Sequence, residues 1–542
     1  MSRRIGIAAA IWAVGILLSR VIALVREAVF GRIVGGGDGA GLYQAAFTIP
    51  DFLNYLLAAG ALSIVFIPMF AGYLERGEEE RGWRAFSNIS TVIGLFLLIA
   101  TALAWLAVPY VNAWWFAGFG AEDLAQLDAM TRVLLPAQIF HVLGGLLSAA
   151  LQARDRHALP AMAPLVYTGA IIVGGLVGGP AAGPWGFVWG VLIGSILGPF
   201  GLPLVGCLRM GLRYRPRLAW DLDLKRYLWQ SLPIMIAFSI IVVDDWLLKG
   251  IASGMPEGAV ATVTYAKQIM RVPMGVFGLA LGAAAYPTLA RLVAQGRTDD
   301  AYTTLARAMR QMLVLALGAQ VVFTVSGAEV ARVIYGDRLM PGQHEAIGSA
   351  LAVFCLALWA WSAHTVLSRG FYARGQTWVP SILGTAVLLV AWPLYGWLAG
   401  PMGTTGLAAA SSIAVTAYVV LLAVWLKRAN PGGTDQFGSF ALRIVPALAL
   451  AVVAGWSLRE LFLQTLPGGL EGTIHDALAP TALGFMAGEL GAFSQGALVG
   501  GIALGLYLVV AAILRVPGLF EVIAMLRRRL PGRLGGGRTA GS

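Results

Sequence analysis

Two cations stand four residues apart, at Lys267 and Arg271, in an otherwise apolar stretch of the chain. On a helix this spacing places both on one face, where they repel each other unless anions lie opposite. Asp244 and Asp245, in the preceding apolar stretch, are natural partners. Guanidinium groups also bind phosphate oxygens in a bidentate manner. The pattern therefore predicts either a buried ion-pair network or a cavity for an anionic ligand.

A similar group of charges interrupts the N-terminal apolar stretch. The segment "LLSRVIALVREAVFGR" carries Arg20, Arg26 and Glu27, and Asp51 lies in the apolar stretch that follows. A charge near the centre of a bilayer costs roughly 2.5–3.5 kcal/mol, so such residues face a protein interior or a water-filled cavity. No nucleophile–base pair, metal-ligand cluster or nucleotide-binding motif accompanies them, so we expect no enzyme, metal site or cofactor.

The composition indicates which elements must position these charges. Of the 542 residues, 58% are hydrophobic and only 12% are charged, and the mean hydropathy is +0.77. Soluble proteins carry about 25% charged residues. The chain is therefore predicted to be an all-α polytopic membrane protein. Its net charge of +11 comes from basic residues in short segments between apolar runs, which indicates membrane topology and no nucleic-acid partner.

A membrane helix needs about 20 apolar residues, and by that length we expect about fourteen spans. They are predicted at 5–32, 40–74, 86–111, 129–152, 158–180, 186–210, 228–253, 258–293, 301–325, 345–372, 378–400, 403–427, 438–463 and 495–516. With a cytoplasmic N-terminus, most of the 38 lysines and arginines fall on the cytoplasmic side, whereas Lys249 and Arg338 are among the few on the outer side. Both termini are thus predicted to be cytoplasmic.

An internal repeat is suggested by matches about 220 residues apart. The dipeptide "AR" at Arg154 precedes Pro160 just as "AR" at Arg374 precedes Pro380. We therefore expect two pseudo-symmetric six-helix lobes, 1–220 and 221–430, followed by two additional helices in 431–542 with an outer loop at 459–494 and a basic cytoplasmic tail. The unusual charges all fall on the first, second, seventh and eighth spans, which would face each other between the lobes.

Prolines and glycines add local expectations. Four prolines in the second and eighth spans predict bends or helix starts beside a cavity, namely Pro50, Pro68, Pro273 and Pro287. Glycines spaced by four residues, such as Gly190 and Gly194, predict close packing of helices. The segment "GGGDG" at 35–39 predicts an outer turn.

Several segments resemble the MurJ/MviN family of lipid II flippases, within the multidrug/oligosaccharidyl-lipid/polysaccharide exporter superfamily. The similar segments are "SRVIALVREAVFGRIVG", "FTIPDFLNYLLAAGALSIVFIPMFAGYLERG", "RHALPAMAP", "YAKQIMRVPMGVFGLALGAAAYPTLARL", "FYARGQTWVP" and "GLAAASSIAV", which lie between residues 5 and 430. The resemblance implies a bacterial inner-membrane protein that moves undecaprenyl-pyrophosphate-linked peptidoglycan precursor to the outer leaflet by alternating access. It also implies cavity arginines that hold the pyrophosphate, and a groove for the prenyl tail on the last two helices.

The resemblance extends only in part to individual residues. Ser19, Arg20, Arg26 and Glu27 match the first-helix motif of the family. Asn54 and Gln268 stand where the family usually has arginine, and Arg271 replaces an acid. The expected substrate-binding residues are Ser19, Arg20, Arg26, Glu27, Asn54, Lys267, Gln268 and Arg271, with Asp51, Asp244 and Asp245 as charge partners. We expect Lys267 and Arg271 to supply the charge of the missing arginines.

Other functions remain open at this point. The chain could export another polyprenyl-phosphate-linked saccharide, or a drug or cation, or it could be a non-transporting scaffold for cell-envelope synthesis proteins. Its expected partners are a lipid-linked anionic saccharide and membrane lipids, and we expect a monomer. The energy source is open between the membrane potential, protons and sodium.

Overall fold

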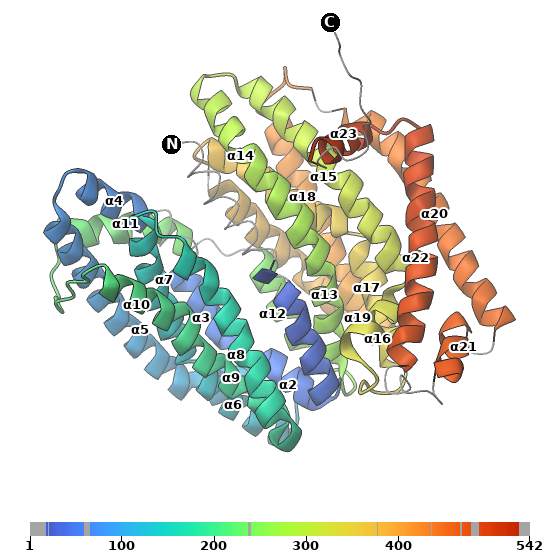
Figure 1. The fold of residues 1–542 in the computed structure, drawn as a ribbon, viewed down its shortest axis with the longest axis horizontal. Coiled ribbons are helices and arrows are strands. Elements are labelled where there is room, and N and C mark those ends of the chain that lie inside the picture. Colours follow the sequence, from blue (N-terminus) through green and yellow to red (C-terminus); the bar gives the residue numbers. More distant parts are fainter. Residues whose placement is uncertain are drawn as a thin grey trace, which may run out of the picture.

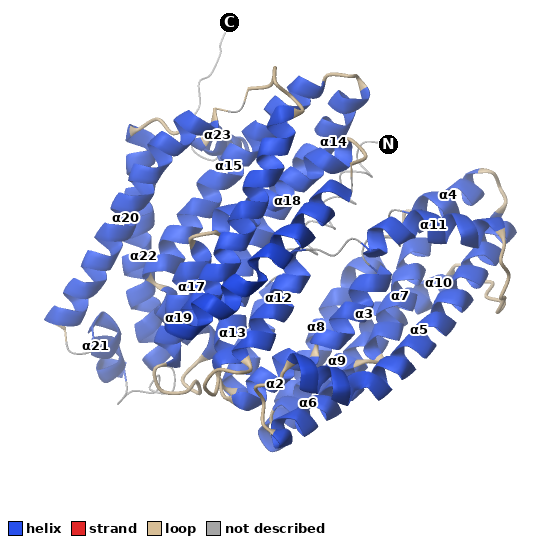
Figure 2. Ribbon diagram, turned by 180° about the vertical axis from the view of Figure 1, so that it is seen from behind, coloured by secondary structure: helices blue, strands red, loops and turns tan. Residues whose placement is uncertain are grey.

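The computed structural model describes residues 18–19, 21–58, 65–236, 240–376, 378–434, 436–466, 469–478 and 487–529. Every regular element in these ranges is a helix, and no strand occurs among them, so the expected all-α fold is confirmed. Figure 2 shows the helices together with the loops that join them. Arg20 lies outside the described residues.

A helix through residues 21–34 begins the described chain. The elements that follow are α2 (Asp38–Ala46), α3 (Thr48–Ala58), α4 (Ile67–Glu75), α5 (Glu79–Trp115), α6 (Ala121–Leu134), α7 (Ala137–Gln152), α8 (Ala158–Ala182), α9 (Pro184–Ser195), the π-helix η2 (Ile196–Gly201), α10 (Leu202–Arg209), α11 (Leu222–Ile236), α12 (Ile240–Ala252), α13 (Ala259–Pro273), the π-helix η3 (Met274–Gly278), α14 (Leu279–Ala294), α15 (Thr298–Val325), α16 (Gly327–Tyr335), α17 (Gln343–Cys355), α18 (Leu358–Ala373), α19 (Trp378–Arg428), α20 (Phe437–Thr465), α21 (Gly469–Leu478), α22 (Ala487–Ile513) and α23 (Leu519–Arg529).

The helices form two groups that lie side by side (Figures 1 and 2). The first group comprises α3–α11 and the second group comprises α12–α23. They diverge towards the upper end of Figure 1, where α4, α14 and α23 lie, and they meet at the lower end, near α2, α6 and α16. Between them at the lower end, α2 contacts both α6 of the first group and α13 of the second. Side chains on α2 and its neighbours can therefore be shared by the two groups.

Helices long and apolar enough to cross a membrane number eight in the described part of the chain, or nine if the bent pair α17 and α18 counts as one span. This length criterion does not reach the expected count of fourteen. The four predicted spans that carry the unusual charges are absent from this set, because they are shorter, interrupted or partly outside the described residues. The predicted span 40–74, for example, is divided into α2, α3 and α4.

Prolines and π-turns mark these interruptions. Pro50 lies in the first turn of α3 and Pro68 in the first turn of α4, so both begin helices. Pro273 ends α13 and is followed by the π-helix η3, whereas Pro287 lies within α14. A proline inside a helix removes one backbone donor, and a neighbouring π-turn accommodates the bend. The charged residues thus lie on helices that are broken beside them.

Close glycine contacts hold α8 against α9, as the spacing predicts. A Cβ atom on Gly190 would lie 2.9 Å from the carbonyl oxygen of Ala170, and one on Gly194 would lie 2.8 Å from that of Tyr167. Only glycine allows two helix backbones to approach this closely. This contact positions Tyr167, whose side chain reaches the central pocket described below.

The C-terminal helices pack on the second group. α20 contacts α15, and α22 contacts both α15 and α16. α20 extends to Thr465 and α22 already begins at Ala487, so the connection between them is shorter than the expected loop at 459–494. Part of it is the helix α21, which packs against α22. The basic tail continues as α23 to Arg529, and residues 530–542 lie outside the described chain.

Candidate functional site

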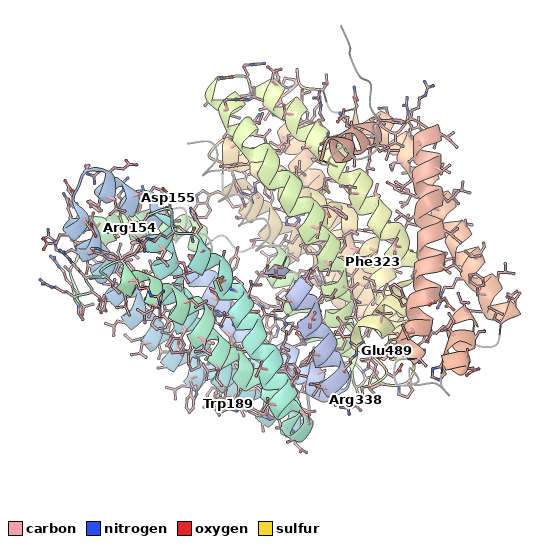
Figure 3. All side chains as sticks on the ribbon, in the orientation of Figure 1. Arg154, Asp155, Trp189, Phe323, Arg338 and Glu489 are labelled. Carbon is pink, nitrogen blue, oxygen red and sulfur yellow. The ribbon has the colours of Figure 1, made fainter. Side chains whose placement is uncertain are left out.

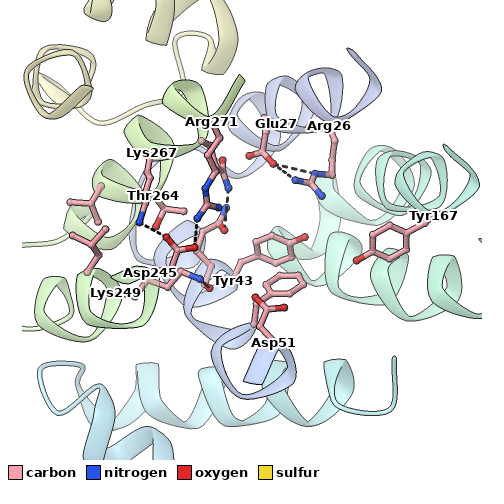
Figure 4. Close-up of a pocket in the computed structure, with 15 residues that line it drawn as sticks. Arg26, Glu27, Tyr43, Asp51, Tyr167, Asp245, Lys249, Thr264, Lys267 and Arg271 are labelled. Atoms are coloured by element: carbon pink, nitrogen blue, oxygen red, sulfur yellow. Dashed lines mark hydrogen bonds and ion pairs between the residues drawn. The ribbon is translucent and has the colours of Figure 1, made fainter. Parts of the chain in front are cut away.

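A pocket of about 250 Å³ lies between the two groups of helices (Figure 4). Its walls come from the helix 21–34, α2, α3, α8, α12 and α13. The lining residues are Arg26, Glu27, Tyr43, Gln44, Phe47, Asp51, Tyr167, Asp245, Leu248, Lys249, Val263, Thr264, Lys267, Gln268 and Arg271. The pocket therefore gathers most of the residues that the sequence singles out, from helices far apart in the chain.

Arg26 and Glu27 form an ion pair on the first wall. The guanidinium Nε of Arg26 donates to Glu27 Oε1 at 3.1 Å, and a terminal nitrogen of Arg26 donates to the same oxygen. The other carboxylate oxygen of Glu27, Oε2, is buried and has no hydrogen-bond partner among the described residues. The Arg26 side chain keeps 29% of its surface exposed. Glu27 thus offsets the charge of Arg26 without enclosing the guanidinium.

Lys267 is buried on the opposite wall. Its ammonium contacts Asp244, lies 2.6 Å from Asp245 Oδ1, and lies 4.9 Å from the ring centre of Trp361. Asp244 also accepts hydrogen bonds from Tyr395 and from Ser411, the latter at 3.0 Å. The two paired cations thus lie beside the two acids of α12, Asp244 and Asp245. Lys267 is only 3% exposed. Of the two cations Lys267 and Arg271, it therefore contributes more to the stability of the wall than to ligand binding.

Arg271 faces the pocket more openly than Lys267. It forms an ion pair with Asp245, and its side chain is 35% exposed. Figure 4 shows Arg271 and Arg26 pointing into the same space from opposite walls. An exposed guanidinium retains donors for a further anion.

Lys249 is a pocket residue that the sequence analysis counted on the outer side and did not include among the expected binding residues. The Lys249 ammonium donates to the main-chain oxygen of Gln44 at 2.8 Å and lines the pocket beside Asp51. α12 ends at Ala252, close to the predicted end of the span at residue 253, and Lys249 lies three residues before that end. Its spacing of four residues from Asp245 is the sequence signal that could have identified it.

Other contributors have no clear sequence signal. Tyr43 and Tyr167 reach the pocket from α2 and α8, and Gln44 provides the carbonyl that Lys249 contacts. Gln268 also lines the pocket, and its Oε1 is buried without a partner among the described residues. Tyrosine occurs both inside and at the surface of proteins, so Tyr43 and Tyr167 alone do not indicate a site, whereas Gln268 is among the expected substrate-binding residues.

The remaining expected residues lie beside the pocket. Asn54 lines an adjoining cavity of about 330 Å³, which shares Asp51, Asp245 and Lys249 with the central pocket. Asp244 is buried behind the wall and lines neither cavity. Ser19 is described but is not a lining residue, and Arg20 lies outside the described residues.

The charges of the pocket nearly balance, with four basic and three acidic lining residues. Arg26 and Arg271 offer donors, whereas Glu27 Oε2 and Gln268 Oε1 offer acceptors. Such a pocket can bind a ligand that carries both phosphate oxygens and hydroxyl or amide donors.

Hydrogen bonds close the lower end of the molecule below this pocket. Gln343 Nε2 donates to the carbonyl oxygens of Gly36 and Gly258, at 2.8 and 3.3 Å. The hydroxyl of Tyr265 donates to the carbonyl oxygen of Gly35 at 2.6 Å. The predicted turn at 35–39 is therefore confirmed at Gly35–Gly37, although α2 already begins at Asp38.

Two arginines add to this closure. Arg32 donates to the carbonyl oxygens of Ile334 and Val333 at 2.6 and 2.9 Å. Arg338 donates to the carbonyl oxygen of Ile33 at 3.1 Å. The helix 21–34 is thus joined to α16 and the loop after it, and the lower end is closed.

We expect Gly36→Ala to open the lower end. A Cβ atom there would lie 1.8 Å from Gln343 Oε1, so the glutamine must move and lose its hydrogen bonds. Loss of about 1.5 kcal/mol increases the open fraction about tenfold. The measurement is the labelling rate of Thr264→Cys in the pocket, with a membrane-impermeant maleimide added on the side that the lower end faces. The natural Cys207 and Cys355 are buried, so they give little background.

Gly169→Ala on α8 is the matched control, because a Cβ atom there meets nothing within 4 Å. Equal labelling of Thr264→Cys in the Gly36→Ala and Gly169→Ala backgrounds would contradict a closing role for the Gly36–Gln343 contact.

Comparisons with known proteins agree on one family. The model of the family described as "Lipid II flippase MurJ" matches residues 31–470. A probable lipid II flippase MurJ of Rhizobium tropici is 29% identical over 422 residues, which are 76% of this chain and 78% of the relative. One of Haemophilus influenzae is 26% identical over 441 residues, which are 76% of this chain and 84% of the relative.

Solved structures show the same fold. "Lipid II flippase MurJ, inward closed conformation" superposes with a TM-score of 0.71 at 18% identity, over 93% of this chain and 98% of that one. An inward-facing multidrug resistance MATE family transporter of the MOP superfamily superposes with a TM-score of 0.62 at 17% identity, over 77% of this chain and 98% of that one. The arrangement of helices in this chain is thus that of a known group of transporters.

Proposed function

Because the chain belongs to the MurJ family of lipid II flippases, we propose that it moves undecaprenyl-pyrophosphate-linked peptidoglycan precursor from the inner to the outer leaflet of the bacterial cytoplasmic membrane. The observation that carries the proposal is the central pocket, in which Arg26 and Arg271 face each other, each with about a third of its side chain exposed. Guanidinium groups bind phosphate oxygens in a bidentate manner, so the pair suits a diphosphate.

The pocket is also suited to release its ligand. When no ligand is bound, Glu27 forms an ion pair with Arg26 and Asp245 forms one with Arg271. These pairs lower the free-energy cost of placing charged side chains between membrane helices. An entering diphosphate replaces these carboxylates only in part, so binding stays moderate. A transporter needs such moderate binding, because a ligand held too tightly is not released.

The positive charges of the two adjoining cavities stand at different sequence positions in this chain from those expected for the family. Asn54 and Gln268 stand where arginines are expected, and Lys249 and Arg271 lie in the same two cavities. We propose that these two cations replace the missing arginines. Lys267, by contrast, is held by Asp244 and Asp245 and supports the wall.

The arrangement of the two groups supports transport by alternating access. We propose that residues 1–220 and 221–430 act as two lobes, joined by α11, which starts the second segment but packs on α3 and α5 of the first group. We also propose that the closed lower end faces outward. Both termini then lie in the cytoplasm, in agreement with the distribution of lysine and arginine. We further propose that α20 and α22 of the segment 431–542 hold the prenyl tail, and that the protein acts as a monomer beside membrane lipids and cell-envelope synthesis proteins.

The test is complementation of a bacterium depleted of its own lipid II flippase. The wild-type chain is expected to restore growth and to prevent accumulation of lipid II in the inner leaflet, whereas Arg26→Gln is not. Arg297→Gln is the matched control, since Arg297 is exposed on the cytoplasmic side of the proposed topology, where it pairs with Asp300.

Two outcomes contradict the proposal. If a well-expressed wild-type chain does not restore growth, the cargo is another lipid-linked saccharide or the protein is not a transporter. If Arg26→Gln restores growth as well as Arg297→Gln does, the diphosphate is not held by Arg26.

A further inference from the structure

A separate cavity of about 270 Å³ lies near the lower end of the second group, between α15–α17 and α20. Phe323, which Figure 3 labels, is the neighbour of the lining residue Thr324 and lies on α15. The cavity has no lining residue in common with the central pocket. Its residues are Thr324, Val325, Gly327, Ala328, Glu329, Glu345, Gly348, Ser349, Ala352, Trp456 and Arg459.

Glu329 is the most buried charge in this cavity. It is 3% exposed, and its Oε1 accepts hydrogen bonds from Arg459 Nε and from Gln495 Nε2, both at 2.8 Å. Its other oxygen, Oε2, is buried and has no partner among the described residues. A buried carboxylate oxygen without a donor is costly, so a donor is expected there.

A second acceptor lies in the same cavity. The hydroxyl of Thr324 is also buried and has no hydrogen-bond partner in the described part of the chain. Ser349 lines the cavity as well, and its hydroxyl donates to the carbonyl oxygen of Glu345. The walls therefore offer several acceptor atoms, and a fitting ligand carries several donors on one small group.

The charge of the cavity walls indicates whether the donor-bearing group of the ligand is positive or negative. Glu329 and Glu345 contribute two negative charges, and Arg459 contributes one positive charge. The net charge of the walls is negative, which favours a cation. Among the described residues, no cluster of three or more histidine, cysteine or acidic side chains could hold a metal ion. A primary ammonium, with one charge and three donors, fits these walls better than a metal.

Apolar surface around the opening indicates that the ammonium belongs to a lipid. Trp456 is 52% exposed, and its indole nitrogen donates to the carbonyl oxygen of Thr324 at 3.2 Å. Exposed Val453 on α20 and exposed Leu356 beside α17 continue this apolar surface. Tryptophan is enriched at the level of lipid head groups. A ligand that enters here from the membrane brings acyl chains for this surface.

We propose that this cavity binds the ethanolamine head group of a phosphatidylethanolamine lipid. The ammonium donates to Glu329 Oε2 and Thr324 Oγ1, and the lipid phosphate lies at Arg459, whose side chain is partly exposed. The proposal is independent of the function proposed for the central pocket. It assigns to this chain a lipid site between α20 and the helices α15–α17.

The test is lipid binding to the purified full-length chain in detergent, measured by native mass spectrometry. We expect phosphatidylethanolamine to bind at least about tenfold more tightly than phosphatidylcholine, whose quaternary ammonium has no N–H donor, or phosphatidylglycerol, which has no ammonium. Glu329→Gln is expected to weaken phosphatidylethanolamine binding about tenfold, and Thr324→Val about threefold. Glu460→Gln, on the same helix as Arg459, is the matched control and should bind as the wild type does.

Thr324→Val leaves the Glu329–Arg459 ion pair in place. Its phosphatidylethanolamine binding therefore tests the proposal even if Glu329→Gln does not fold. Unchanged phosphatidylethanolamine binding in Thr324→Val and in folded Glu329→Gln would overturn the proposal. Equal binding of phosphatidylcholine or phosphatidylglycerol would overturn the assignment of an ammonium. Saturation by free ethanolamine with no preference for the lipid would show that the ligand is a soluble amine.

Discussion

Replacement of Lys267 by methionine is expected to destabilise the folded protein by about 3–5 kcal/mol, because a buried ion pair that loses one partner leaves an uncompensated charge. Lys267 is 3% exposed and Asp244 is 1% exposed, so neither carboxylate nor ammonium can turn to water. Methionine fills a similar volume, so the effect is one of charge more than of packing. The measurement is thermal unfolding in detergent, followed by loss of helical signal.

A second substitution separates charge from shape in this prediction. Asp244→Asn in the Lys267→Met background removes the orphaned charge. The amide oxygen of the asparagine can accept from one of the hydroxyls of Tyr395 and Ser411, and its amide N–H can donate to the oxygen of the other. Asp245 still pairs with Arg271 in that variant. The double variant is therefore expected to regain most of the lost stability. A melting temperature of Lys267→Met equal to that of the wild type would contradict the structural role of this pair.

Arg271→Gln is expected to reduce transport about 10- to 100-fold while the fold is preserved, because hydrogen bonds to a charged group contribute about 1.5–3 kcal/mol. The side chain is 35% exposed, and Asp245 keeps Lys267 at 2.6 Å when Arg271 is removed. Arg271 is thus a cleaner probe of binding than Lys267. The measurement is appearance of lipid II in the outer leaflet, in cells that depend on this chain.

Arg291→Gln is the control for this second prediction, since Arg291 is exposed near the end of α14. Arg271→Lys should retain intermediate transport, because lysine keeps the charge but loses the planar fork of donors. Transport by Arg271→Gln at the level of Arg291→Gln would show that the diphosphate does not contact this wall.

Much of the charge pairing could be predicted from the sequence for one physical reason. Apolar stretches do not tolerate single charges, so Lys267 and Arg271 required acids, and Asp244 and Asp245 were the nearest ones in a neighbouring span. The structure forms these pairs. The all-α fold was predictable from the same apolar composition.

Contacts between distant segments were harder to predict, and one residue of the site was missed for that reason. Hydropathy placed the end of the seventh span near residue 253, close to the end of α12 at Ala252, and counted Lys249 on the outer side. The side chain instead turns inward to the carbonyl oxygen of Gln44, about 200 residues earlier in the chain. Such a partner is fixed by tertiary packing, which a hydropathy window does not contain. The early start of α22 at Ala487 was missed for a local reason, because the charged Glu489 in its first turn lowers the hydropathy of that segment.

The contacts that close the lower end bear on how this chain can diverge. Arg32, Arg338, Tyr265 and Gln343 all donate to main-chain oxygens across this end. An acceptor of this kind is present whatever side chain the residue carries. Substitutions at Ile33, Val333 or Ile334 therefore leave these bonds available, whereas loss of a donor, or gain of bulk at a glycine such as Gly36 or Gly258, removes one. Distant relatives can therefore keep the closed state although the side chains at the positions that supply the accepting main-chain oxygens differ between them.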